Sequence, residues 1–169
     1  MDYKIMPMKP KHCEGKAYVH YKAWQETYRG LMPDEYLDKR TYEQCLQNGM
    51  AGMEHTFVAV AEGEVAGFIR YSPEAREYTD RPGYSEIHAL YVLKKYQRYG
   101  IGRSLVEQCL QKLPHRSVVL FVLKGNENAI RFYKRMGFSL TGKEYYGETS
   151  VGRITELEMI MENTDAYDR

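Results

Sequence analysis

A pair of glycines stands between a cluster of cations and an amphipathic segment in residues 91–105, YVLKKYQRYGIGRSL. Gly100 and Gly102 have no Cβ, so the backbone there can adopt unusual φ values and let a ligand approach closely. The first amides of a following helix lack internal partners, and the helix dipole adds partial positive charge. Such a loop fits a phosphate group, to which Arg98 and Arg103 would add charge-assisted hydrogen bonds.

The loop by itself leaves phosphate binding open. The dinucleotide-binding fingerprint needs a third small residue where Leu105 stands, and the P-loop needs a Gly-Lys-Ser/Thr ending that is absent. The alternative is a glycine turn that leads into an ordinary helix, with Lys94 and Lys95 in a solvated run of charge.

The hydrophobic content of 43% is ordinary for a soluble globular protein. The 169 residues predict one domain, 1–169, with a frayed polar tail at 163–169. The net charge of +1 gives no argument for a general nucleic-acid or membrane binder. Three scattered cysteines argue against a disulfide framework and offer no metal-ligand spacing. With no signal-like or membrane-spanning apolar run, we expect a cytoplasmic location and no metal.

Hydrophobic periodicity and turn residues predict the order β, α, α, β, β, β, α, β, α, β, β. We expect a single α/β or α+β domain, in which a mixed sheet carries helices on its faces. The predicted helices are 13–30, 32–49, 101–113 and 126–137, and the predicted strands are 2–9, the hairpin 56–72, 84–93, 117–123, 138–147 and 153–162.

The glycine loop, read as Gln97-Arg98-Tyr99-Gly100-Ile101-Gly102, resembles the acetyl-CoA motif Arg/Gln-x-x-Gly-x-Gly/Ala of the GNAT acetyltransferases. The segment NENAIRFYKRMGF at 126–138 is similar to a second motif of that family, Asn followed seven residues on by Tyr and then Gly-Phe. The resemblance covers residues 3 to 161. It implies a mixed, mostly antiparallel twisted sheet of about seven strands with helices on both faces, splayed between strands four and five.

Acetyl-CoA lies in that splay in the family. The resemblance implies that its diphosphate rests on the backbone amides of 98–103 and that its pantetheine arm pairs with a strand edge, as in strand addition. The cofactor-binding residues that it implies are Leu90, Tyr91, Val92, Gln97, Arg98, Tyr99, Gly100, Ile101, Gly102, Arg103, Asn126 and Tyr133.

Acetyl transfer to an amine poses two proton problems. Only about one lysine-like amine in a thousand is free base at neutral pH, so a base must take its proton. The thiolate of CoA leaves more readily if it receives a proton. Tyr133 is the candidate acid, seven residues after Asn126 on one face of a helix. The alternative is that Tyr133 only packs the helix.

Glu86 is the candidate base, because family members with a catalytic glutamate often carry it in a Glu-Ile pair at the start of the strand predicted here at 84–93. The alternative is an exposed glutamate at a sheet edge. His88 faces the same side and has a reference pKa suited to a proton relay, although a structural histidine is the simpler interpretation. Other members carry a glutamate on the fifth strand, where Phe121 stands here.

On the acceptor side, Trp24 and Tyr28 lie at the end of the first helix, where the family builds its acceptor cleft. An aromatic wall would suit an amine cation, but such a stripe is more often core. With Glu86 and His88 they form the predicted substrate site. The resemblance implies an N-acetyltransferase acting by direct attack in a ternary complex on a small-molecule or peptide amine, in a chain that can form a homodimer.

Two other functions stay open. A non-catalytic acyl-CoA sensor could use the same fold, because a fold does not fix a function. A nucleotide or nucleic-acid binder could use the basic loop, although a net charge near zero weighs against it.

Overall fold

The structure, a computed structural model, describes residues 1–150 and 152–165. The chain divides into two compact units. Unit 1 comprises Met1–Tyr71 and Ala89–Cys109, and unit 2 comprises Ser72–His88 and Leu110–Arg169. That the two units act as one domain remains a prediction.

The strands form a seven-stranded sheet in the order β1-β2-β3-β4-β5-β7-β6. Strand β4 (Tyr84–Val92) is parallel to β5 (Ser117–Leu123), whereas the β1–β2, β2–β3, β5–β7 and β6–β7 pairs are antiparallel. The parallel ladder ends at Ile87 and Leu120, before either strand does. The predicted mixed, mostly antiparallel sheet with a splay between strands four and five is therefore confirmed.

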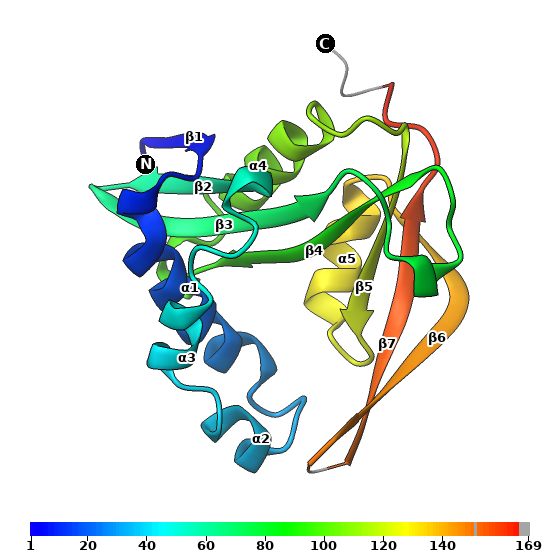
Figure 1. Ribbon diagram of the computed structural model, residues 1–169, viewed down its shortest axis with the longest axis horizontal. Coiled ribbons are helices and arrows are strands. Elements are labelled where there is room, and N and C mark those ends of the chain that lie inside the picture. Colours follow the sequence, from blue (N-terminus) through cyan, green and yellow to red (C-terminus); the bar gives the residue numbers. More distant parts are fainter. Residues whose placement is uncertain (151, 166–169) are drawn as a thin grey trace. The chain divides into compact units, whose positions relative to one another are not determined.

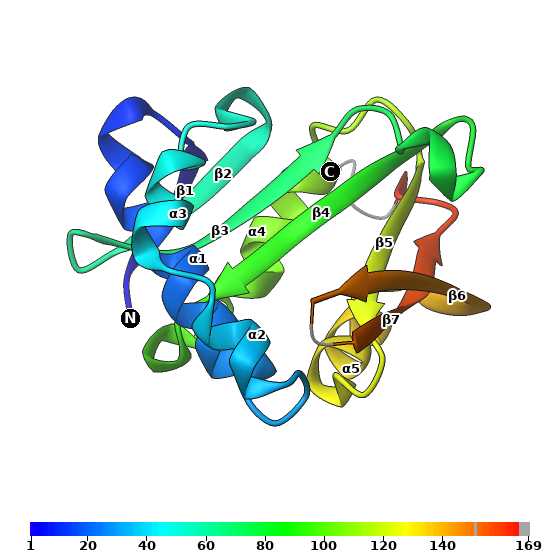
Figure 2. The same cartoon turned by 60° about the horizontal axis from the view of Figure 1, so that its bottom comes forward.

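Unit 1 holds β1 (Tyr3–Pro7), β2 (Thr56–Ala61), β3 (Glu64–Ser72) and the end of β4. Helices α1 (Cys13–Tyr28) and α4 (Ile101–Leu110) lie on opposite faces of these strands (Figures 1 and 2). Buried apolar residues of α1, β2 and β3 form the core, among them Ala17, Val19, Val58, Phe68 and Ile69. Among the described residues, no helix is long and apolar enough to cross a bilayer.

The predicted single helix over 32–49 is wrong. The segment forms two short helices, α2 (Asp34–Asp38) and α3 (Tyr42–Gln47). Thr41 is the reason, because its hydroxyl accepts from the backbone N–H of Gln44 while the Gln44 side chain accepts from the Thr41 N–H. This capping box starts a new helix and ends the earlier one.

Unit 2 holds the first part of β4, β5, β6 (Ser139–Thr149), β7 (Gly152–Met161) and α5 (Glu127–Arg135), which lies against β5 and β7 in Figures 1 and 2. Strand β5 is buried on both faces, as its continuous apolar run predicts. Helix α5 begins where the Asn126 side chain accepts from the Ala129 N–H at 3.2 Å. It ends before Gly137, whose φ of +97° favours glycine.

Gly67 in β3 is required by the close approach of the end of β4. A Cβ at residue 67 would lie 2.7 Å from the carbonyl oxygen of Tyr91. Because backbone cannot move aside as a flexible side chain can, we expect Gly67→Ala to lower the free energy of unfolding by about 1–3 kcal/mol, measured by urea denaturation.

Gly147→Ala in β6 is the matched control, because nothing lies within 4 Å of the added Cβ. It should change stability by less than about 1 kcal/mol. Equal losses in the two variants would show that the approach to Tyr91 does not constrain residue 67.

Candidate active site

The loop of unit 1 between β4 and α4 presents backbone donors to solvent. Arg98 has a φ of +68° and Gly100 a φ of +86°, so the backbone alternates in a way that lets successive amides converge. Within the described chain, the amides of residues 98–102 donate to no protein acceptor. Residues 97–100 are exposed. The loop therefore offers an unsatisfied set of N–H donors at the start of a helix, as an anion site requires.

Buried residues fix both ends of this loop. Tyr96, in the short 3-10 helix Lys94–Tyr96, is 2% exposed, and its hydroxyl donates to the Glu64 carboxylate. Ile101, the first residue of α4, is 1% exposed. The side-chain NH₂ group of Gln97 donates to the backbone carbonyl of Val92 at 3.1 Å, which ties the loop to the end of β4. The backbone amides of residues 98–102 are thus held in place, although they donate to no acceptor within the described chain.

The cationic side chains near the loop have different surroundings. Arg103 donates through Nε to Glu107 at 2.7 Å, one turn further along α4. Lys95 pairs with Glu64, while the backbone N–H of Lys94 donates to Glu26 at 3.0 Å. The side chains of Arg103 and Lys95 are therefore already paired with carboxylates, whereas the backbone amides of 98–102 have no protein acceptor.

In unit 2, α5 carries Asn126 and Tyr133, both 8% exposed. The Asn126 oxygen caps the helix, which leaves its NH₂ group as the donor for a ligand. The Tyr133 ring makes edge contacts with Phe132 and Phe138, at centroid distances of 5.2 and 5.6 Å. Tyr133 thus packs against its neighbours, and these two contacts fix the orientation of its ring.

Glu86, the predicted base, is completely buried in β4, so the alternative of an exposed edge glutamate does not apply. Arg76 surrounds its carboxylate. The backbone N–H of Arg76 donates to Oε2 at 3.0 Å, Nε donates to Oε1 at 3.0 Å, and Nη2 also donates to Oε1. Arg76 thus supplies charge-assisted hydrogen bonds to both oxygens of this buried carboxylate.

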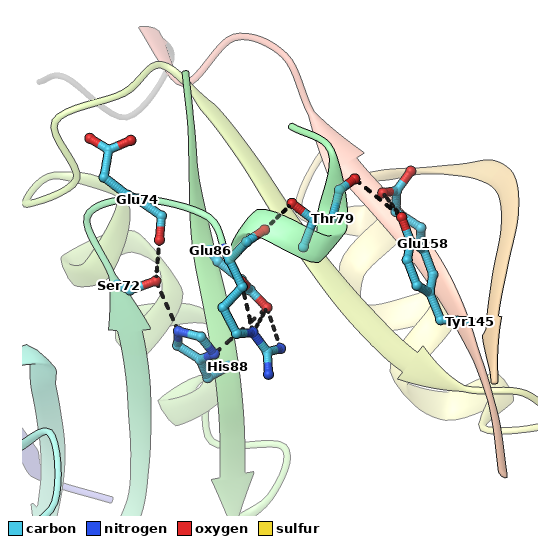
Figure 3. A network of polar contacts seen from close by, with 8 residues as sticks. Ser72, Glu74, Thr79, Glu86, His88, Tyr145 and Glu158 are labelled. Atoms are coloured by element: carbon cyan, nitrogen blue, oxygen red, sulfur yellow. Dashed lines mark hydrogen bonds and ion pairs between the residues drawn. The ribbon is translucent and has the colours of Figure 1, made fainter. Parts of the chain in front are cut away.

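His88 connects Glu86 to Ser72 within unit 2 (Figure 3). The Ser72 hydroxyl donates to the Glu74 carbonyl at 2.6 Å, so its oxygen accepts from His88 Nε2–H at 2.9 Å. His88 Nδ1 then faces Glu86 Oε1 at 3.6 Å. This arrangement provides a place for a proton at Nδ1, beside a carboxylate.

Sequence reasoning missed a second buried carboxylate, Glu158 in β7. It is fully buried and pairs with Arg81, while Thr141 donates to it at 2.8 Å. The Tyr145 hydroxyl donates to it at 3.4 Å (Figure 3). Burial raises its pKa, but the hydrogen bonds from Arg81 and Thr141 prevail and lower it. Two glutamates alternating with apolar residues in the segment ELEM were the available signal.

The predicted acceptor residues Trp24 and Tyr28 lie together in unit 1. Their rings meet edge to face at 4.7 Å, and the Tyr28 hydroxyl lies 3.2 Å from that of Tyr91. The ring of His20 stacks on Tyr91 at 5.5 Å. Tyr28 thus contacts the end of β4 through Tyr91, on the strand segment predicted to bind pantetheine, and Trp24 contacts Tyr28.

The other residues predicted to bind the cofactor lie at ordinary partly buried or exposed positions. Leu90, Tyr91 and Val92 are half-buried, Tyr99 is 51% exposed, and Gly102 lies in the first turn of α4.

In residues 1–150 and 152–165, no group of three His, Cys, Asp or Glu side chains could hold a metal ion.

Solved structures share this fold. That of a protein from Pyrococcus horikoshii superposes with a TM-score of 0.73 at 23% identity, over 96% of this chain and 99% of that one. The PaiA N-acetyltransferase of Thermoplasma acidophilum, solved with coenzyme A, superposes with a TM-score of 0.69 at 21% identity, over 96% and 99%. The chain thus shares its fold with these two proteins.

Sequence comparison gives the family. The model of the acetyltransferase (GNAT) family matches residues 18–138. A probable N-acetyltransferase of Mycobacterium tuberculosis is 26% identical, over 84% of this chain and 83% of that protein. The uncharacterised N-acetyltransferase YuaI of Bacillus subtilis is 31% identical, over 70% and 69%. The chain belongs to the GNAT family and is an enzyme of the acyltransferase class.

The pair Arg76–Glu86 should contribute measurably to stability. Arg76→Gln removes the side-chain donors of a buried carboxylate, so we expect a loss of about 1–3 kcal/mol in the free energy of unfolding. Arg153→Gln breaks an exposed pair with Glu148 and should cost less than about 1 kcal/mol. Equal urea midpoints for the two variants would contradict the importance of the Glu86 pair.

His20 makes unit 1 sensitive to acid. Burial, then the positive charges of Arg40, Lys16 and Arg70, lower its pKa from 6.5 to about 4. Between these values the unfolded chain binds the proton and the folded chain does not. Stability should therefore fall by about 3 kcal/mol as the pH drops from 7 to 4, in addition to losses common to other groups.

The measurement is the free energy of unfolding against pH for the wild type and His20→Gln, with NMR titration of the His20 ring. The two stability curves should converge at low pH, because the variant lacks this one loss. An imidazole that titrates near 6.5 in the folded protein would contradict the prediction.

Proposed function

We propose that this chain transfers the acetyl group of acetyl-CoA to a primary amine of a small molecule or peptide, by direct attack in a ternary complex. One observation carries the proposal: the amides of 98–102 stand without protein acceptors at the start of α4. Exposed backbone donors at the start of a helix are groups that bind phosphates. Acetyl-CoA would supply an activated thioester, and the residues of the chain would bind it and move protons.

Each unit would contribute separately to binding the cofactor. In unit 1 the loop amides would hold the diphosphate, supported by Arg98, and the backbone of 90–92 would meet the pantetheine amides. In unit 2 the NH₂ group of Asn126 would be a donor for the cofactor, as the family resemblance implies. These residues fit CoA because they offer donors to its phosphates and amides without a competing carboxylate on the loop itself.

Tyr133 would act as the acid. Its ring is clamped by Phe132 and Phe138, so the hydroxyl has little rotational freedom and its position is set in advance. A phenol placed beside the departing sulfur would give that sulfur a proton, which lowers the barrier for breaking the thioester.

His88 and Glu86 would manage the proton of the amine together. Arg76 already occupies both oxygens of Glu86, so we assign the carboxylate an indirect role through His88. The amine would lose its proton, directly or through a water, to His88 Nδ1. Glu86 would then stabilise the imidazolium, and the bond from Nε2 to Ser72 would keep the ring in orientation.

The alternative, a non-catalytic acyl-CoA sensor, has one observation in its favour, which is this occupation of Glu86 by Arg76. A sensor would bind acetyl-CoA and release no thiol with any amine.

We also propose a cytoplasmic, reducing location, which suits three free cysteines, two of them buried. A homodimer, and the absence of nucleic-acid and membrane partners, remain parts of this proposal.

The experiment is calorimetry with acetyl-CoA, followed by detection of free thiol over a panel of amines. Micromolar binding with amine-dependent thiol release is the expected result. Binding without release over the whole panel would favour the sensor, and no binding at millimolar acetyl-CoA would reject both functions.

Tyr133→Phe should lower kcat by about 10²–10⁴-fold, with little change in the Kd for acetyl-CoA, because only the proton donor is removed. Steady-state kinetics and calorimetry measure the two effects. Tyr18→Phe is the matched control, since Tyr18 is 47% exposed on α1. An unchanged kcat in Tyr133→Phe would leave Tyr133 with its packing role alone.

A further inference from the structure

Unit 1 contains cations without counterions. Lys16 is 4% exposed, and its ammonium group donates to the Gly49 carbonyl at 3.3 Å and lies 5.2 Å from the centre of the Phe68 ring. Arg40 and Arg70 are partly buried. Among the described residues, no carboxylate forms an ion pair with any of the three. Since buried cations are normally paired, this excess of positive charge needs an explanation.

A pocket of about 440 Å³ opens beside these cations, and its lining contains no carboxylate. A volume of this size suits a small molecule or part of one. Its walls come from α1, the segment 36–40 and α3, and the residues that matter here are His20, Tyr36, Lys39, Arg40, Gln44 and Asn48.

Arg40 is prepared to bind an anion. Its guanidinium lies 4.1 Å from the centre of the Trp24 ring, so stacking holds the group flat and leaves its N–H edge available. A planar carboxylate or a phosphate matches that edge through two parallel hydrogen bonds. Gln44 adds to the donors, because its oxygen is already engaged by the Thr41 N–H and its NH₂ group is not.

The positive charges around His20 also favour an anion in this pocket. Arg40 faces it from the segment before α3, Lys16 from α1 and Arg70 from β3, while the rings of Trp24, Phe68 and Tyr91 pack around it. Burial and these three cations keep the imidazole neutral, with a pKa of about 4. An anion bound at Arg40 would offset part of the positive field and so raise the pKa of His20.

The pocket adjoins the strand segment assigned to the cofactor. His20, which lines the pocket, stacks on Tyr91 with centroids 5.5 Å apart, and Tyr91 is one of the residues proposed to meet pantetheine. A molecule whose anionic group lies in the pocket would therefore extend along the side of unit 1 that carries Tyr28 and Tyr91.

We propose that this pocket binds the carboxylate or phosphate group of the acceptor, so that the preferred substrate is a small amine that also carries an anion. The proposal rests on the proposed acetyl transfer. It assigns Arg40 the role of binding the anion and Trp24 that of the platform on which the guanidinium lies.

The first test compares matched acceptors that differ only in the anion: lysine with cadaverine, phenylalanine with phenethylamine, and 2-aminoethyl phosphate with ethanolamine. The ratio of kcat/KM values within at least one pair should exceed about tenfold in favour of the anionic acceptor, as one charge-assisted pair provides. In Arg40→Gln that ratio should fall to about one. Lys22→Gln removes a charge from the exposed face of α1 and should keep it. A ratio near one in the wild type, or one that Arg40→Gln leaves unchanged, would overturn the proposal.

The second test needs no acetyl transfer. Inorganic phosphate is titrated into the full chain while NMR follows the His20 ring, whose pKa should rise by about one unit in the wild type and stay constant in Arg40→Gln. If phosphate acts this way and no amine is acetylated, the anion site stands and the proposed function fails. If amines are acetylated without preference and His20 does not respond, the function stands and the anion site fails.

Discussion

Charge that is removed from water must be neutralised by the protein or by a ligand, and this requirement governs the polar interior of both units. In unit 2, the fully buried carboxylates Glu86 and Glu158 each meet an arginine, Arg76 or Arg81, from one short segment between β3 and β4. That segment is therefore tied to the sheet by ion pairs. Unit 2 neutralises its buried acids with its own residues.

Unit 1 meets the same requirement differently. Lys16, Arg40 and Arg70 have no carboxylate partner in the described chain, and the loop amides of 98–102 have no acceptor. Both features leave positive potential in one unit, at the start of α4 and beside His20. The proposed binding of an anionic cofactor and an anionic acceptor would use this positive potential, because the ligands would then supply the missing negative charge and hydrogen-bond acceptors.

The exposed loop stays ordered because its neighbours are buried. Tyr96 and Ile101 anchor it on both sides, and Gly67 lets the end of β4 approach β3 closely enough for the Leu93 N–H to reach the Ala66 carbonyl at 3.0 Å. Donors that are held in place but unused lose little conformational entropy when a ligand arrives, which is the physical meaning of preorganisation.

Most of the fold could be predicted from the sequence because its signals are local. Hydrophobic period and turn residues lie within one element, so nearly every strand and helix was found. The helix over 32–49 failed because one capping residue, Thr41, outweighed a continuous amphipathic pattern. The loop at 98–103 could be recognised because its glycines and its helix are contiguous.

The partners of buried charges were out of reach of the sequence. Arg76 lies in a loop without periodicity, ten residues before Glu86, and Glu158 and Arg81 are 77 residues apart. Whether a cation has a counterion depends on contacts that only the folded chain makes. The burial of Glu86 and the isolation of Arg40 could therefore not be inferred from spacing.

The partner of Glu86 also decides what kind of proton chemistry is open to His88. A bare buried carboxylate would hold an imidazolium tightly and keep its proton. Because Arg76 already forms an ion pair with Glu86, the carboxylate is shared between Arg76 and the His88 Nδ1 atom, which lies 3.6 Å from Oε1. Such sharing would suit the role proposed for His88, which is to accept a proton from the amine and pass it to water in every cycle. In the proposed function, the Arg76 side chain would thus make Glu86 the support of a relay through His88 rather than the base itself.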